Sequence, residues 1–189
     1  YALMARAYMQ KYKVTEEDLA AISVKNHYHG SLNPKAQFQS PITIAHVMKS
    51  SKIADPLKLL DCSPISDGAA AVIITSDDSI KIKKPVYIAA SEVATDTLSL
   101  HDRKSFTSLS AVVDASATAY KKVGIKPQDI DVCEIHDCFS ISEAIATEDL
   151  RFSEKGFGAK DIAKGKRTLF KGSIICNPSG GLKACGHPV

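Results

Sequence analysis

The chain has 189 residues, 44% of them apolar, and its 24 basic and 21 acidic side chains give a net charge of +3. This composition is typical of a soluble globular protein that can bury a substantial core, in one domain or in parts of two. It excludes a membrane span, because no apolar run approaches the roughly 20 residues required, and it disfavours nucleic-acid binding, because neither a zinc-binding spacing nor a basic stripe with interleaved aromatic residues occurs.

The first third of the chain predicts helices separated by loops. Residues 1–9 have a helical apolar spacing, and Thr15, followed by three acidic residues, predicts a capped second helix that ends near Asn26. Prolines interrupt the next segment, and residues 44–49 predict a short helix. Because polar and proline-containing stretches are frequent, we expect residues 1–60 to cover a site rather than to form a sheet core.

The middle of the chain predicts two strands and a helix. Residues 68–75 form a continuous apolar run of the length expected for a strand buried on both faces, and residues 85–90 start another. The polar turn between them, residues 76–84, is the predicted domain boundary. Residues 111–120 predict a helix rich in small residues that ends at Gly124 in a left-handed conformation.

The last third predicts a strand that ends at His136, a helix over residues 140–151 and a strand over residues 173–176. This alternation of strands and helices favours an α/β sheet covered by helices. Ligands of such sheets bind at the carboxyl ends of the strands. We therefore expect residues 136–139 and the glycine-rich residues 177–187 to face one pocket.

The residue types in these two segments indicate acyl-thioester chemistry. The first contains a histidine and a thiol, and the second contains a histidine that follows several glycines. A cysteine, with a reference pKa of about 8.5, becomes a useful base or nucleophile when an imidazole or a helix amino terminus stabilises its thiolate. An imidazole can in turn donate a hydrogen bond to a developing oxyanion.

The same residues carry a family resemblance. HDCF at residues 136–139 and GHP at residues 186–188 occur together with HYHGSLNPKAQF at residues 27–38 and DPLKLLDCSPISDGAAA at residues 55–71. This ordered set resembles the thiolase superfamily, most closely its sterol-carrier-type and archaeal acetoacetyl-CoA thiolase branch. In that branch HDCF stands where other thiolases have NEAF.

The resemblance implies a layered αβαβα thiolase fold, incomplete in this chain. Residues 1–60 would belong to the loop domain that caps the site, residues 61–84 would end the N-terminal half, and residues 85–189 would form a C-terminal half that is cut after GHP. The family pattern also implies a chain about twice as long, with the nucleophilic cysteine before Tyr1. We therefore expect the sequence to be part of a larger enzyme.

The resemblance also implies catalytic roles for three residues. His187 would help to form the oxyanion hole that binds the thioester oxygen. His136 stands at the position of the asparagine of NEAF, which in relatives positions a water in the same hole. Cys138 would replace a base cysteine that other thiolases carry elsewhere.

Three further residues are candidate substrate contacts. Phe139 would form a wall of the acyl pocket, and Ser63 would contact the pantetheine arm of CoA, both by resemblance. Gly181 is a candidate because a glycine allows the backbone to approach a ligand or a neighbouring loop.

The function that these expectations favour is a thiolase-type acyltransferase that condenses two acetyl-CoA to acetoacetyl-CoA or catalyses the reverse cleavage. The alternatives are a longer-chain sterol-carrier-type 3-oxoacyl-CoA thiolase and a non-catalytic thiolase-like scaffold subunit. No cofactor is expected beyond the CoA thioester substrate. The resemblance suggests a homodimer or tetramer, and a hydroxymethylglutaryl-CoA synthase and a bridging zinc protein as partners.

The remaining histidines and cysteines favour structural interpretations. Five cysteines without CxxC spacing indicate a reducing compartment, which we take to be the cytoplasm or, in a eukaryote, the peroxisome. A metal site is not expected at residues 136–138, because adjacent residues of a strand point to opposite faces. The histidines interpreted as structural are His27, His29, His46 and His101. The cysteines expected to be small buried hydrophobes are Cys62, Cys133, Cys176 and Cys185.

Overall fold

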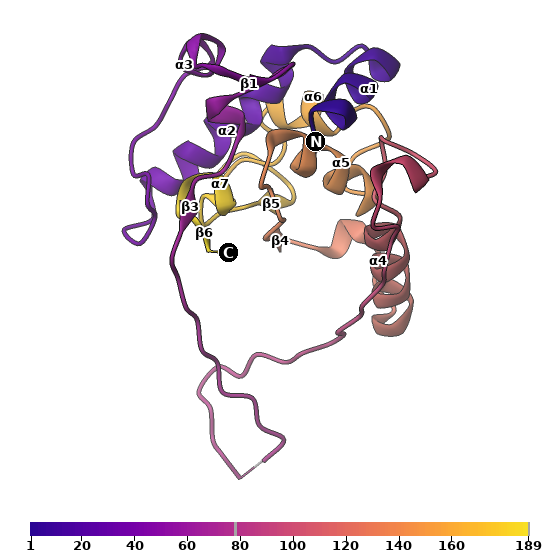
Figure 1. The fold of residues 1–189 in the computed structure, drawn as a ribbon. Helices are drawn as coiled ribbons and strands as arrows, with labels where there is room; N and C mark the ends of the chain where they lie inside the picture. Colours follow the sequence, from indigo (N-terminus) through magenta and orange to yellow (C-terminus); the bar gives the residue numbers. More distant parts are fainter. Residues whose placement is uncertain (78, 189) are drawn as a thin grey trace.

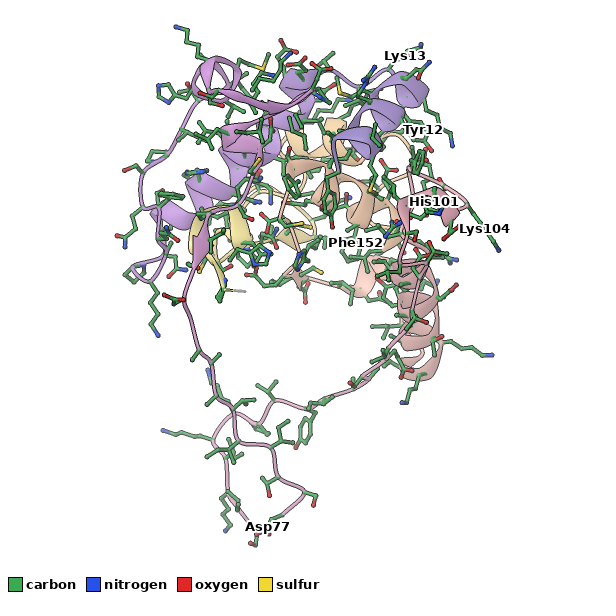
Figure 2. All side chains as sticks on the ribbon, in the orientation of Figure 1. Tyr12, Lys13, Asp77, His101, Lys104 and Phe152 are labelled. Atoms are coloured by element: carbon green, nitrogen blue, oxygen red, sulfur yellow. The ribbon has the colours of Figure 1, made fainter. Side chains whose placement is uncertain are left out.

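A computed structural model describes residues 1–77 and 79–188. Helices and short strands pack together in one body, and most of the segment between β3 (Ile65–Ser66) and α4 (Ser110–Val123) extends away from it as a long loop (Figure 1). The last part of the segment returns to the body, where Leu100 and Leu109 pack against the core. Asp77 lies at the far tip of this loop (Figure 2). Asp78, within the predicted polar turn, lies outside the described residues, as does Val189.

The first two helices form where the sequence predicts them. α1 spans Ala2–Tyr12 and α2 spans Glu16–Ser31. The Thr15 hydroxyl accepts a hydrogen bond from the backbone N–H of Asp18 at 3.1 Å, and the Asp18 carboxylate accepts one from the Thr15 N–H at 3.0 Å. This reciprocal capping fixes the start of α2. The prediction that α2 ends near Asn26 is wrong, because the helix continues for another turn that packs against the C-terminal part of the chain.

The main hydrophobic core lies between these helices and two later ones, α5 (Ser140–Asp149) and α6 (Gly158–Ala163). α1 and α2 both contribute buried apolar side chains to this core, which lies between helices and is not a sheet core. The expectation that residues 1–60 cover a site stays a prediction. The core includes Met4, Ala5, Tyr8, Leu19, Ile22, Ile141, Ala144 and Ile145.

The strands are short and form pairs. β1 (Lys52–Ala54) pairs antiparallel with β2 (Leu57–Lys58). β3 pairs parallel with β6 (His187–Pro188). β4 (Val132–Cys133) pairs parallel with β5 (Ile175–Cys176), so the two strands predicted in the last third are neighbours. β4 is shorter than predicted, because the chain leaves the pairing before His136.

Other predicted features are confirmed. α3 forms at the expected residues, and α4 ends at Gly124, whose φ of 76° is the left-handed conformation predicted for it. The remaining elements are α3 (Ile44–Lys49), η1 (Leu59–Asp61), η2 (Leu100–Asp102), η3 (Pro127–Asp129) and α7 (Gly181–Cys185).

The two strands predicted at residues 68–75 and 85–90 do not form. Both runs are unpaired in the described part of the chain, and their apolar side chains are exposed, as shown by Val72, 81% exposed, and Ile73, 95% exposed. The physical reason is that a strand hydrogen-bonds to a neighbour and not to itself. No described strand lies alongside either run, so apolar content alone does not produce a strand here.

Candidate active site

The HDCF segment occupies the turn between β4 and α5. Phe139, in an extended conformation, is the residue before the first helical residue, so Cys138 lies just outside the amino terminus of a ten-residue helix. His136 is exposed at the surface of the turn, whereas Asp137 and Cys138 are buried. The amino terminus of a helix favours negative charge, so this placement suits a cysteine that must become a thiolate.

The GHP segment arrives beside it along a path shaped by left-handed residues. After β5 the chain turns at Asn177, whose φ is 55°, and at Gly180, whose φ is 108°, passes through α7, and turns again at Gly186, whose φ is 124°. β6 then carries His187 alongside β3. The rings of His136 and His187 meet edge to face, with centroids 5.1 Å apart. The prediction that both segments face one site is confirmed.

A cavity of about 320 Å³ opens at this site. Its lining includes His136, Gly181, Cys185 and Gly186. A second cavity of about 520 Å³ lies elsewhere, beside Phe152 and Arg167. We place the candidate active site at the smaller cavity, because the residues that line the larger one include neither a histidine nor a thiol. Of the three candidate catalytic residues, His136 lines the smaller cavity, whereas Cys138 and His187 are not among its lining residues.

The surroundings of the exposed His136 favour the neutral form of its imidazole. Partial burial, and secondarily the nearby His187 ring, lower the pKa of His136. A neutral imidazole has one donor and one acceptor nitrogen, so His136 can hold a water or a carbonyl oxygen. Nδ1 of His187 is buried and has no hydrogen-bond partner among the described residues.

Cys138 lies among groups from three segments. Its Sγ is 3.6 Å from the Ser142 hydroxyl, one turn along α5, and its carbonyl accepts a hydrogen bond of 2.9 Å from the Ser63 N–H. The next residue, Phe139, stacks on Tyr1 with ring centroids 4.6 Å apart. Burial, and then the interaction with Cys138, raise the pKa of the Tyr1 phenol. The structure thus brings the Ser63 backbone to the backbone of Cys138, next to Phe139, while the contacts of Ser63 and Phe139 with substrate stay predictions.

Gly181 has a structural reason to be glycine. Its φ is 61°, and a Cβ built there would lie 2.5 Å from the nearer carboxylate oxygen of Asp137. The close approach is therefore to a neighbouring loop, one of the two reasons considered from the sequence. Gly181 also lines the cavity, so a contact with substrate stays a prediction.

Most histidines interpreted as structural make contacts within the fold. His29 donates from Nδ1 to the carbonyl of Asn177 at 2.8 Å and accepts at Nε2 from the Leu169 N–H at 3.0 Å. His46 caps α3, and His27 stacks on Phe38. No described cysteine forms a disulfide.

The prediction of burial is wrong for three cysteines. Cys176 is fully buried, but Cys62, Cys133 and Cys185 are only half-buried. Burial is nevertheless the main cause that raises the pKa of Cys176 to about 12 and of Cys133 to about 11, which keeps these two thiols protonated.

The sequence interpretation missed the polar residues beneath the histidines. Asn26, Glu143 and Asn177 are fully buried and hydrogen-bonded around Asp137. One signal was available: Asn26 and His29 stand four and seven residues after Ile22, which places them on the buried face of α2. Polar side chains on a buried helix face indicate partners elsewhere in the chain.

Comparison with known proteins identifies the family. The family profile described as "Thiolase, N-terminal domain" matches residues 1–78, and the one described as "Thiolase C-terminal domain-like" matches residues 92–189. The chain belongs to the thiolase family. Its mixed helices and strands, with parallel pairs at the histidine segments, are consistent with an incomplete α/β thiolase fold.

The chain is also similar to individual proteins. An acetyl-CoA acetyltransferase of Methanothermobacter thermautotrophicus is 51% identical over all of this chain and 50% of its own length. Sterol carrier protein 2 of Bos taurus is 41% identical over 97% of this chain and 35% of its own length. A solved structure, the "Ltp2-ChsH2(DUF35) aldolase", superposes with a TM-score of 0.85 at 28% identity over 98% of this chain and 50% of that one. The chain thus spans about half the length, or less, of these relatives.

Two further observations concern this thiolase chain. The described residues contain no group of three or more His, Cys, Asp or Glu side chains that could hold a metal ion. Among the helices that the structure describes, none is long and apolar enough to cross a membrane.

Proposed function

We propose that the protein containing this chain is a thiolase-type acyltransferase that acts on acyl-CoA. The observation that carries the proposal is the meeting of the His136 and His187 rings, with centroids 5.1 Å apart, at the HDCF turn, which also places Cys138 at a helix amino terminus. We propose acetyl-CoA as the first substrate to test. The protein would condense two acetyl-CoA to acetoacetyl-CoA or catalyse the reverse cleavage. The printed name of the archaeal relative, acetyl-CoA acetyltransferase, supports this choice.

In the proposed condensation an acyl group is held as a thioester on a cysteine that lies outside this chain. The Cys138 thiolate removes a proton from the α-carbon of a second thioester, and the resulting carbanion attacks the acyl carbonyl carbon. The carbon–carbon bond forms as the carbon–sulfur bond to the nucleophilic cysteine breaks, so the nucleophile returns as a thiolate. His136 and His187 donate hydrogen bonds to oxygens that gain negative charge.

The proposal includes the substrate contacts and the assembly. Ser63 would contact the pantetheine arm of CoA, Phe139 would form a wall of the acyl pocket, and the backbone at Gly181 would approach the substrate. The proposed division is a loop domain in residues 1–60, the end of the N-terminal half in residues 61–84 and the C-terminal half from residue 85. We propose a homodimer or tetramer, which light scattering of the intact protein would test, and a hydroxymethylglutaryl-CoA synthase with a bridging zinc protein as partners.

The test separates acylation from proton transfer. The intact protein should release CoA from acetyl-CoA, and Cys138→Ala should still take up an acetyl group, seen by mass spectrometry, but form no acetoacetyl-CoA. The matched control is Cys133→Ala, which removes a thiol from β4 and should retain turnover. Loss of acylation in Cys138→Ala with proton exchange intact would reverse the assigned roles.

A second measurement tests whether the nucleophile lies elsewhere. Residues 1–189 alone should release no CoA from acetyl-CoA, because none of the described cysteines is assigned as the acylated one. Turnover by this chain that is lost in Cys138→Ala would contradict the proposal.

A longer-chain substrate is the second candidate, favoured by the similarity to bovine sterol carrier protein 2. A higher kcat/KM for a branched or long 3-oxoacyl-CoA than for acetoacetyl-CoA would establish it. If no acyl-CoA is turned over and no acylation occurs, a non-catalytic scaffold subunit replaces both enzymatic candidates.

A further inference from the structure

Four buried polar side chains are hydrogen-bonded to one another and to the backbone of Ile135 and Leu182, in the two histidine segments. They come from α2, the HDCF turn, α5 and the turn after β5, and each is 0% exposed. We refer to them as the carboxylate clamp, which consists of Asn26, Asp137, Glu143 and Asn177.

Asp137 joins the HDCF turn to the helix that leads to His187. One carboxylate oxygen accepts the backbone N–H of Leu182, in α7, at 2.6 Å. The other accepts the side-chain amide of Asn26, in α2, at 2.6 Å. Because Asp137 directly follows His136, its side chain connects one histidine to the segment that carries the other.

Glu143 holds the other side of the same turn. Its Oε2 accepts the Asn26 amide at 2.7 Å and the Asn177 amide at 3.1 Å. The Asn177 side-chain oxygen in turn accepts the N–H of Ile135 at 2.6 Å. Ile135 directly precedes His136, so the clamp holds the backbone on both sides of this histidine.

The clamp brings two carboxylates close together in a buried place. Nζ of Lys25 lies 2.6 Å from Oε1 of Glu143. That oxygen has no well-directed hydrogen bond among the described residues, so the contact is ionic. Lys183 is also buried, and its Nζ donates to the carbonyl of Asp61 at 2.6 Å. Buried ion pairs add little stability over well-packed apolar side chains, so stability alone does not explain the arrangement.

We propose that Asp137 and Glu143 are positioning residues that fix His136 and His187 relative to each other for the reaction. This inference rests on the proposed function. Neither carboxylate takes part in a chemical step. Asp137 acts through the N–H of Leu182, in the helix that leads to His187. Glu143 acts through the side chain of Asn177, which holds the N–H of Ile135 next to His136. Preorganised donors of this kind stabilise a transition state only while their placement is maintained.

The chain contains a matched control for this role. Glu148 is also in α5 and also buried, and it accepts the Tyr8 hydroxyl and the Gly158 N–H. Its partners lie in α1 and α6 and not in the histidine segments. Glu143→Gln and Glu148→Gln therefore make the same chemical change in the same helix, and only the first touches the clamp.

The first test is kinetic and uses the intact protein. In Asp137→Asn the new NH2 group faces either the Asn26 amide or the Leu182 N–H, so two donors meet in either orientation. We expect kcat to fall about 10- to 100-fold in Asp137→Asn and Glu143→Gln, with KM changed less than about threefold, because a displacement near 1 Å is enough for such losses. Glu148→Gln should retain kcat. Equal losses in Glu143→Gln and Glu148→Gln would overturn the proposal.

A double-mutant cycle separates positioning from a general loss of folding. If Asp137 acts through His187, then adding Asp137→Asn to a His187→Ala variant should cost much less than it costs alone. Independent, multiplying losses would contradict this. If Asp137→Asn does not fold, Asn26→Ala takes its place, because it removes the amide that links the two carboxylates and keeps the Leu182 hydrogen bond.

Crystal structures of the variants provide a readout that does not depend on activity. The two rings should remain about as close as in the wild type in Glu148→Gln and should separate in Asp137→Asn. If the wild type turns over no acyl-CoA, the proposed function fails, while the ring separation still tests the clamp. Unchanged rings together with unchanged kcat in Asp137→Asn would show that the carboxylates have no positioning role.

Discussion

Two apolar stretches of this chain have opposite environments, and the difference lies in their hydrogen bonding. In α5, Ile141 and Ile145 are fully buried in the main core. In the loop below the packed body (Figure 1), Val72 and Ile73 are almost fully exposed. A helix satisfies its own backbone groups and needs only a surface to pack on, whereas a strand needs a second strand in place.

The comparison also separates two kinds of apolar surface. The buried Ile141 and Ile145 contribute to the core of this chain. The exposed Val72 and Ile73 are neighbours, so they leave a larger apolar surface than a single exposed residue would. Truncating a buried apolar side chain should lower the free energy of unfolding of residues 1–189 measured alone. Truncating an exposed one should lower it only if another surface covers that side chain. Four predictions test this difference and the site that depends on it.

The largest expected effect is on the packed side of the comparison. Ile145→Ala should lower the free energy of unfolding of residues 1–189 by about 2–5 kcal/mol, because it removes a fully buried side chain and leaves a cavity. Urea denaturation followed by circular dichroism measures it. A loss under about 1 kcal/mol would mean that α5 does not pack as described.

His187 should matter for turnover and not for packing. In the intact protein His187→Ala should reduce kcat about 100- to 1000-fold, or roughly 3–4 kcal/mol, because it removes a donor to the developing oxyanion. The side chain is only half-buried, so the thermal midpoint should change little. Near wild-type turnover, or a variant that unfolds, would remove the support for this role.

A pH effect of about 1 kcal/mol is expected from Asp137. Burial, and then the charge of Glu143, raise the pKa of Asp137 to about 6, against the attraction of Lys183 and Lys25. A carboxyl whose pKa is raised by folding stabilises most when protonated, below its unfolded pKa of about 4, and loses this contribution as the pH rises through 6. Stability due to Asp137 should therefore be greater at pH 5 than at pH 7.5.

The measurement compares wild type with Asp137→Asn at both pH values. The buried His27 and His29, whose pKa values burial lowers, change stability in the opposite direction, but they do so equally in both proteins. The difference between the two proteins isolates Asp137. An identical pH dependence in both would show that this carboxyl is ionised throughout the range.

The same contrast explains what the sequence could predict. Helices were predictable from spacing and capping residues, as at Thr15, because those signals are local. The meeting of His136 and His187 was predictable from motif order and from strands that run parallel. The end of α2 and the exposed run at residues 68–75 were not, because both depend on contacts with residues far away in the sequence.

The clamp shows the same limit within the site. The sequence identifies His136 and Cys138 because their chemistry is specific to few functions. Asn26 and Glu143 have no such signature, because asparagine and glutamate occur in many structural contexts. Asn26 acts through hydrogen bonds to Asp137 and Glu143, which lie more than a hundred positions further along the sequence. Long-range pairing of common polar residues is not encoded in a local pattern.

The smallest expected effect is on the exposed side of the comparison. Ile73 is the same residue type as Ile145 but is 95% exposed, so Ile73→Ala removes almost no buried surface. In residues 1–189 it should change the free energy of unfolding by less than about 0.5 kcal/mol, the usual range for surface substitutions. Ile145→Ala, measured under the same conditions, is the control that shows the assay can detect a loss.

A cost above about 1 kcal/mol for Ile73→Ala would mean that this loop is covered in solution, by a second copy or by another part of the chain. Comparing the cost at low and high protein concentration then identifies which, because only coverage by a second copy depends on concentration.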